Sequence, residues 1–386
     1  MVETASIEER LDAIEVHDVD THVSEPPDLW TSRMPSKWGD ETPHVEVGPD
    51  GRRAWFSGGE RIMGAAGAAD EHPLLDTDTW AGATDPHARL RWMDKHGIRS
   101  QVLYPNLVGF FGAMFATRDP AFGIDVYRAY NDFQTDFSSV APDRLIPLAN
   151  LPFWDLDASV AELERCHGMG HKGLNFGFRF EQIGLPRLRD MHWDPILRRA
   201  EEMGWSVNFH VGFSGNPADD PALQFDVDHS DFDRVKFAAA LFAGNMQCIA
   251  ELIMSGLCKR YPTLKFVSVE SGIGFIPYLI EALDWQFVNQ NLHRTHPDWL
   301  RPSEYFRRQI YGCFWFEQDV ARLADLYPDN FMFESDYPHP TSLTPADDLE
   351  FVLGPRETII ANLATLPDDL LRKVVHDNAA RVYGLD

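Results

Sequence analysis

Short apolar runs alternate with amphipathic segments along most of the chain. The runs are apolar at most positions, which is typical of strands buried on both faces. The segments between them have helical periodicity, and several end in glycine (Gly97, Gly170 and Gly204), which adopts the left-handed helix-ending conformation at low cost. This alternation predicts parallel β-α-β units. We expect eight strands, at residues 14–19, 100–104, 145–150, 173–176, 206–210, 265–269, 309–313 and 330–334.

Eight such units favour a closed (β/α)8 TIM barrel of the α/β class over a doubly wound open sheet. One barrel with insertions accounts for all 386 residues, so we expect a single domain over residues 1–386. Residues 26–84 interrupt the alternation after strand 1 and are rich in Gly, Pro, Trp and Met. This insertion is either a lid at the catalytic face or a surface addition that packs its own aromatic side chains. The candidate lid residues are Trp30, Trp38, Arg52, Arg53, Trp55 and Arg61.

The charge and the cysteines limit the partners and the compartment. Sixty acidic against 34 basic residues give a net charge of −26, which repels phosphate backbones and anionic lipids. We therefore expect a small-molecule substrate, and neither nucleic acid nor a membrane as partner. The four cysteines are far apart in sequence and form no CxxC pair, as in a reduced cytoplasmic protein. No stretch approaches the roughly 20 apolar residues of a membrane span.

Residues that bind metals occur where three predicted strands end. Asp20 and His22 follow strand 1 at alternate positions, which point the same way in extended chain. His210 ends strand 5 before a glycine, and Asp336 follows strand 8 before Tyr-Pro. Taken singly, these residues would more often be a hydrogen-bonded pair, a core histidine and a turn aspartate. Together, at matching strand ends, they predict a divalent ion, with zinc as first choice and manganese as second.

Other polar residues near strand ends are candidates for substrate contact or for structural hydrogen bonds. They are Tyr104, Asn175, Arg179, His229 and His339. The GxSxG motif of serine hydrolases does not occur, nor does a glycine-rich phosphate loop. Both absences disfavour serine hydrolysis and nucleotide chemistry.

Several stretches resemble the amidohydrolase superfamily, specifically the amidohydrolase-2 branch that contains aminocarboxymuconate-semialdehyde decarboxylase. They are DVDTHVSEPPDLW, LRWMDKHGIRSQVLYPN, APDRLIPLANLP, WDPILRRAEEMGWSVNFHVG, FVSVESGIGFIPYLIEALD, FMFESDYPHP and DNAARVYGL. The resemblance covers nearly the whole chain. It implies a metal-dependent barrel that forms dimers, with Asp20 and His22 as the strand-1 ligand pair, His210 as the strand-5 ligand and Asp336 as the strand-8 ligand.

The chain departs from this family at strand 6, where Glu270 replaces the usual catalytic histidine. Glu270 is a base, a ligand or a structural acid. A carboxylate near a cation normally stays ionised, so we expect hydrolysis of a cyclic or aromatic substrate by a metal-activated water, with Asp336 or Glu270 as base. The alternatives are non-oxidative decarboxylation of an aromatic or unsaturated acid, and a barrel that binds a ligand without turnover.

Overall fold

The computed structural model describes residues 6–48, 51, 53–64, 77–110, 115, 118–211, 231–339, 341–344 and 352–385. These residues divide into two compact units. The first unit contains residues 1–19, 176–334 and 357–386, and the second contains residues 20–175 and 335–356. The prediction of one domain over the whole chain stays a prediction.

A parallel sheet forms the core of the first unit. Its strands are β9 (Ser206–His210), β10 (Lys265–Val269), β11 (Ile310–Phe314) and β12 (Phe331–Phe333), paired in that order. Nearly every residue in them is buried, as their continuous apolar runs predict. Parallel pairing brings the carboxyl ends of these strands to one edge, where ligands bind in such sheets.

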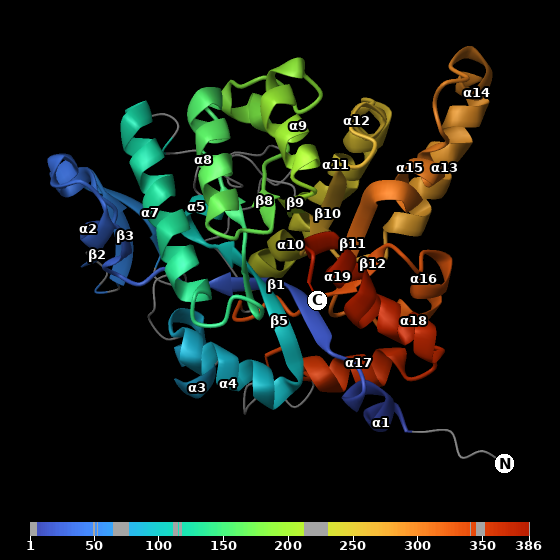
Figure 1. The fold of residues 1–386 in the computed structure, drawn as a ribbon, viewed down its shortest axis with the longest axis horizontal. Helices are drawn as coiled ribbons and strands as arrows, with labels where there is room; N and C mark the ends of the chain where they lie inside the picture. Colours follow the sequence, from blue (N-terminus) through green and yellow to red (C-terminus); the bar gives the residue numbers. More distant parts are fainter. Residues whose placement is uncertain are drawn as a thin grey trace. The chain divides into compact units, whose positions relative to one another are not determined.

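Helices connect these strands in the alternating order that the sequence predicts (Figure 1). They are α1 (Ile7–Asp12), α9 (Asp194–Glu202), α10 (Asp231–Leu241), α11 (Ala243–Met254), α12 (Leu257–Arg260), α13 (Ile276–Asn289), α14 (Leu292–Thr295), α15 (Pro302–Gln309), α16 (Val320–Leu326), most of α17 (Pro355–Leu363), α18 (Asp368–Arg372) and α19 (Asn378–Tyr383). Helix α9 illustrates why these segments form helices. Proline stands in its first turn, and Ile196, Leu197 and Ala200 form its buried face.

The second unit begins inside β1 (Val16–Val23), which neighbours β5 (Ile98–Pro105) and then β6 (Leu145–Pro147). A further parallel pair is β7 (Ala149–Asn150) with β8 (Gly173–Asn175). The helices α4 (Pro86–His96), α7 (Pro120–Ser138) and α8 (Leu156–Gly168) alternate with these strands, and α5 (Leu107–Phe110) is one short turn after β5. Gly97 ends α4 with a φ of 69°, as predicted.

The predicted first strand was placed too early. It was expected at residues 14–19, whereas β1 runs to Val23 and buries all eight of its residues. Asp18, Asp20 and His22, which the sequence placed at the end of this strand, lie inside it. They are tolerated inside the strand because they are buried polar residues with partners in the fold.

The insertion at residues 26–84 has secondary structure that the sequence pattern did not reveal. Its strands β2 (His44–Val47), β3 (Arg53–Ser57) and β4 (Glu60–Gly64) form an antiparallel sheet, and α2 (Leu29–Arg33) and α3 (Thr77–Thr84) flank it in sequence. Trp30 and Trp55 are fully buried, with ring centroids 5.0 Å apart. Both side chains are therefore buried, and their part in a lid stays a prediction. Arg52 lies outside the described residues, and the lid role of the insertion stays a prediction.

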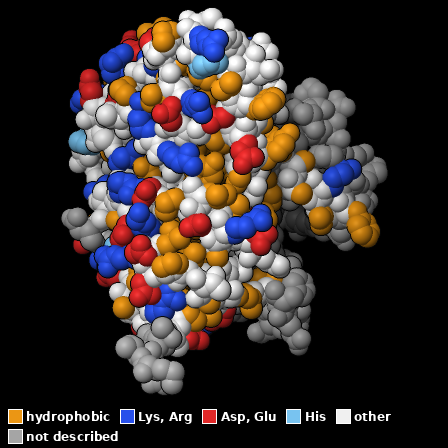
Figure 2. All heavy atoms as spheres, turned by 90° about the vertical axis from the view of Figure 1, so that its right-hand side faces the viewer, with side chains coloured by type: hydrophobic (Ala, Val, Ile, Leu, Met, Phe, Trp, Pro, Cys, Tyr) orange, Lys and Arg blue, Asp and Glu red, His pale blue; other side chains and the backbone are white. Residues whose placement is uncertain are grey.

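Helix α13 exposes large apolar side chains on one face of the first unit. Tyr278 and Trp285 are each 70% exposed, and Val288 is 41% exposed. Figure 2 shows hydrophobic side chains interspersed with charged ones on the face that carries α13 to α16. The dimer implied by family resemblance stays a prediction. Among the described residues, no helix combines the length and the apolar character needed to cross a bilayer.

Candidate metal centre

A short parallel bridge in the second unit brings three predicted residues together. Thr21 of β1 pairs with Tyr337, which follows β12 in sequence. The Asp336 N–H donates to the Asp20 carbonyl over 2.9 Å, and the His22 N–H donates to the Tyr337 carbonyl over 2.6 Å. These backbone bonds align the segment after the last strand with β1, so residues more than 300 positions apart in sequence become neighbours.

His22 lies between two carboxylates. Its Nε2 is 3.7 Å from Asp20 Oδ1 and 3.7 Å from Asp336 Oδ1, and all three side chains are fully buried. Its Nδ1 lies 3.1 Å from the Pro105 carbonyl oxygen, which can only accept a hydrogen bond. Nδ1 therefore carries the hydrogen, and Nε2 presents a lone pair toward the carboxylates. A lone pair and two buried carboxylates at this spacing suit a divalent cation.

His339 completes this cluster. Its ring stacks on His22 with centroids 3.7 Å apart, and its Nδ1 is 2.9 Å from Asp336 Oδ1. His22, Asp336 and His339 each offer a ligand atom within 4.8 Å of the others. The second unit thus contains a group of buried nitrogen and oxygen donors that can hold a metal ion.

Arg89 supports the cluster from within the core. Its guanidinium is fully buried, donates to the carbonyls of His22 and Gly82, and lies 4.4 Å from the centre of the Tyr337 ring. It thereby connects α3 to the two bridged segments that carry the candidate ligands, namely β1 at His22 and the segment at Tyr337.

The first unit contains its own pair of candidate residues. Register in the sheet sets His210 opposite Val269, and His210 Nε2 is 3.0 Å from Glu270 Oε2. The Glu270 N–H donates to Glu334 Oε2 over 3.2 Å. Asn245 ties both strands together by donating to the carbonyls of Phe209 and Val269.

Two of these acids have left-handed backbone conformations. Glu270 has a φ of 49° and Asp336 a φ of 59°, values that side-chain-bearing residues rarely adopt. Such conformations cost free energy and cluster at functional sites. Glu270 directly follows β10, and Asp336 comes three residues after β12 in sequence.

The predicted substrate residues have different surroundings. Tyr104 is fully buried, 6.1 Å from the His22 ring. Asn175 is partly exposed at the end of β8, and its Nδ2 donates to Asn150 Oδ1 over 3.0 Å. Arg179 Nη2 donates to Gln247 Oε1 over 2.7 Å. His229 lies outside the described residues. Substrate contact by these residues stays a prediction.

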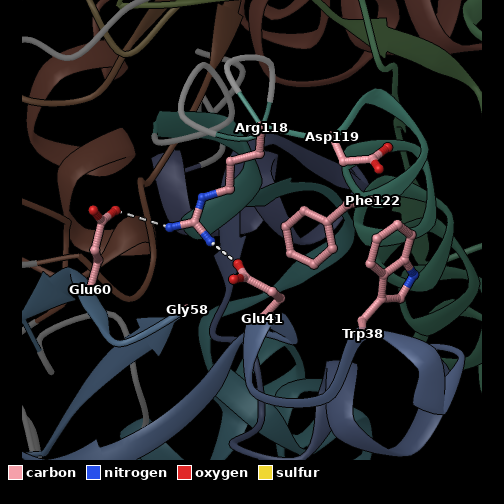
Figure 3. Close-up of a pocket in the computed structure, with 7 residues that line it drawn as sticks. All are labelled: Trp38, Glu41, Gly58, Glu60, Arg118, Asp119 and Phe122. Atoms are coloured by element: carbon pink, nitrogen blue, oxygen red, sulfur yellow. Dashed lines mark hydrogen bonds and ion pairs between the residues drawn. The ribbon is translucent and has the colours of Figure 1, made fainter.

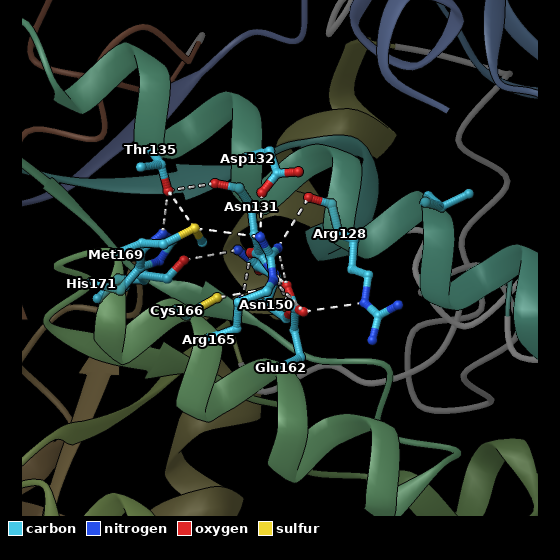
Figure 4. A network of polar contacts seen from close by, with 12 residues as sticks. Arg128, Asn131, Asp132, Thr135, Asn150, Glu162, Arg165, Cys166, Met169 and His171 are labelled. Atoms are coloured by element: carbon cyan, nitrogen blue, oxygen red, sulfur yellow. Dashed lines mark hydrogen bonds and ion pairs between the residues drawn. The ribbon is translucent and has the colours of Figure 1, made fainter. Parts of the chain in front are cut away.

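A polar network anchors Asn150 and, through it, Asn175. Asn131 accepts the Asn150 N–H and donates to the Asn150 carbonyl and to Glu162. Glu162 in turn accepts from Arg165 of the same helix. Figure 4 shows this network between α7 and α8, with Asn131 and Asn150 at its centre. The network fixes the side-chain amide of Asn131 and the backbone of Asn150.

Glu25 was missed by sequence reasoning. It is fully buried, and burial raises its pKa from 4.5 to about 7, although the N–H groups of Leu107 and Asn106 partly oppose this. It follows His22 by three residues in the stretch HVSEPP. An acid before two prolines resembles an exposed turn, so only its burial reveals it.

A separate cavity of about 530 Å³ lies in the insertion region of the second unit. It is lined by Trp38, Glu41, Gly58, Glu60, Arg118, Asp119 and Phe122. Arg118 points toward Glu41 and Glu60 and bonds to both, at 2.8 and 3.1 Å (Figure 3). These ion pairs connect the segment before α7 to the small antiparallel sheet.

Comparison with known proteins decides the family, because the amidohydrolase family model matches residues 18–385. The chain belongs to the amidohydrolase-2 family. A γ-resorcylate decarboxylase from Rhizobium radiobacter is 26% identical over 325 residues, which are 82% of this chain and 90% of that protein. Enzymatic function is thereby confirmed.

Solved structures confirm the predicted (β/α)8 TIM-barrel class. An amidohydrolase from Mycobacterium avium subsp. paratuberculosis superposes with a TM-score of 0.76 at 22% identity, covering 96% of this chain and all of that one. A dihydroxybenzoic acid decarboxylase from Polaromonas sp., solved with manganese and the inhibitor 2-nitroresorcinol, has a TM-score of 0.60 at 17% identity, covering 96% and 97%. The identity of the metal in this chain, zinc or manganese, stays a prediction.

Proposed function

We propose that this amidohydrolase-2 protein is a metal-dependent, non-oxidative decarboxylase of an aromatic acid. The match to a γ-resorcylate decarboxylase over 82% of the chain carries the proposal. It favours the lyase alternative over the hydrolase that the strand-6 glutamate suggested. The second support is the His22, Asp336 and His339 cluster, which combines donors for a cation with an imidazole whose Nδ1 lies 2.9 Å from one of them.

Asp20, His22, His210 and Asp336 hold the divalent ion in this proposal. The family pattern supports this set, as does the tautomer of His22, whose Nε2 lone pair lies 3.7 Å from both aspartates. A divalent ion bound there supplies a positive charge that neutralises the substrate carboxylate and a neighbouring oxygen. Manganese suits this set as well as zinc does, because half of its donors are carboxylate oxygens.

The protein's own residues supply position and a proton. Decarboxylation breaks the bond between the ring carbon and the carboxylate, CO2 leaves, and the electron pair stays on the ring carbon until it takes a proton. His339 Nδ1 and Asp336 Oδ1 lie 2.9 Å apart, so a proton taken up from water and held between these two atoms is the one that the pair delivers. Asp336 is fully buried, whereas the His339 side chain is 20% exposed, so this pair connects the buried carboxylate to the surface.

The test is release of CO2 from a panel of aromatic carboxylic acids by enzyme loaded with Mn2+. We expect CO2 and the ring product with hydrogen in place of the carboxylate. In D2O, the product should carry one deuterium at that carbon. A manganese-loaded enzyme that releases no CO2 from hydroxylated, methoxylated or amino-substituted benzoic acids would refute the proposal.

Attack by a metal-activated water is the second candidate, favoured by Glu270. Its Oε2 lies 3.0 Å from His210 Nε2, as expected for a base beside a ligand. Hydrolysis or hydration would incorporate oxygen from solvent into the product, whereas decarboxylation would not. Reaction in H2(18)O followed by mass spectrometry of the product separates the two.

A further inference from the structure

Glu25 is fully buried and follows His22, a member of the His22, Asp336 and His339 cluster, by three residues. Its Oε1 accepts the N–H of Asn106 over 3.0 Å and the N–H of Leu107 over 2.8 Å. These two N–H groups belong to the chain that leaves the end of β5 and enters the short turn α5. One carboxylate oxygen thus fixes the backbone at Asn106.

Asn106 forms the link between Glu25 and the cluster. Its Nδ2 donates to the Val23 carbonyl over 3.3 Å, which directs its Oδ1 toward His339 Nε2, 2.7 Å away. An amide oxygen can only accept a hydrogen bond, so His339 Nε2 carries the hydrogen. Nδ1 is then the nitrogen that faces Asp336 Oδ1, 2.9 Å away.

The orientation of His339 therefore depends on contacts at both ring nitrogens and on one face. Asp336 contacts Nδ1, Asn106 contacts Nε2, and His22 stacks on the ring. Loss of the Asn106 contact would let the imidazole turn or exchange tautomers. Either change would alter the nitrogen presented to Asp336.

We propose that Glu25 is a positioning residue that acts through Asn106 to hold His339 in one tautomer and one orientation against Asp336. The hydrogen bonds of Glu25 are with Asn106 and with the backbone of Leu107. The kinetic consequence rests on the proposed decarboxylase function. The effect on the tautomer of His339 does not.

The central variants are Glu25→Ala, which removes the acceptor, and Glu25→Gln, which keeps an oxygen at the same place. We expect Glu25→Ala to lower kcat about 10- to 100-fold, the usual effect of losing a partner that orients such a residue, with KM changed about twofold or less. Glu25→Gln should recover most of this loss. Asn106→Leu should reproduce the Glu25→Ala effect, because it removes the amide that contacts His339.

A double-mutant cycle with His339→Phe separates positioning from general destabilisation. If Glu25 acts through His339, Glu25→Ala has little further effect on kcat once His339 is phenylalanine. Gln309→Leu is the matched control. Gln309 is a buried residue of the first unit that directly precedes β11, and it donates to the carbonyls of Tyr261 and Leu264, which precede β10. The variant should lower Tm without this kinetic signature.

Nitrogen-15 NMR of the histidine rings gives a readout independent of turnover. In protein without added metal, the wild type and Glu25→Gln should show His339 with the hydrogen on Nε2, assigned by its loss in His339→Phe. Glu25→Ala should show mixed tautomers. An unchanged tautomer in Glu25→Ala, or an equal loss of kcat in the His339→Phe background, would overturn the proposal. If the wild type releases no CO2 but the tautomer changes as expected, only the proposed function fails.

Discussion

The imidazole rings of His22 and His339 stack with centroids 3.7 Å apart and an interplanar angle of 26°. His22 presents Nε2 toward Asp20 and Asp336, while His339 presents Nδ1 toward Asp336. The two rings therefore share one carboxylate but have different bonding partners. We infer that His22 serves the metal and His339 serves proton transfer.

Replacing His339 tests this division of roles. His339→Phe keeps an aromatic ring against His22 but removes the hydrogen bond to Asn106 and the nitrogen that faces Asp336. We expect kcat for CO2 release to fall about 100-fold or more, the usual contribution of a general acid, while the bound manganese measured by elemental analysis stays near the wild-type amount. Loss of the metal together with the activity would instead identify His339 as a ligand.

Asp336→Asn should remove both functions at once, because Asp336 contacts both histidines. We expect undetectable turnover and a Kd for Mn2+ raised about tenfold or more, since the amide is a weaker, uncharged ligand. Stripping the wild type with a chelator should abolish activity, and adding Mn2+ should restore it. Full activity in the stripped enzyme or in the variant would exclude a metal-dependent reaction at these residues.

Asn175 should select substrates by hydrogen-bond type. Its Nδ2 is committed to Asn150 Oδ1, and Asn150 Nδ2 to the Leu148 carbonyl, so Asn175 Oδ1 is left to accept a bond from a substrate hydroxyl. Asn175→Leu should raise KM about fivefold or more for a hydroxylated acid, the value of one hydrogen bond of about 1 kcal/mol, and change it little for the methoxy analogue. Equal changes for both would show that Asn175 does not contact that group.

Glu25 should make stability depend on pH. Burial raises its pKa from 4.5 to about 7, so the folded state binds its proton more tightly than the unfolded state. The resulting stabilisation is full below about pH 4.5 and is lost as the pH rises through about 7. Between pH 5.5 and 8, the free energy of unfolding of the wild type should fall by about 2 kcal/mol relative to Glu25→Gln. Urea unfolding at both pH values measures this, and parallel pH profiles would contradict it.

The alternating pattern predicted the barrel strands well. Seven of the eight expected strands overlap the observed ones closely, including β9 and β10, whose bounds were predicted to the residue. Strands buried on both faces have continuous apolar runs, which need no partner to be recognised. The sheet of the insertion was missed, because its strands are short, partly exposed and weakly patterned.

The sequence by itself determined the order of strands and helices and the identity of Asp20, His22, His210 and Asp336 as candidate ligands, because strand ends and residue types are local properties. The tertiary structure decided which side chains meet. It brought His339 against His22 and Asn106, placed the Glu25 carboxylate against the backbone of Asn106, and gave Glu270 and Asp336 left-handed backbones. Contacts between residues hundreds of positions apart, and burial itself, depend on how distant segments pack. No local pattern of residues contains that information.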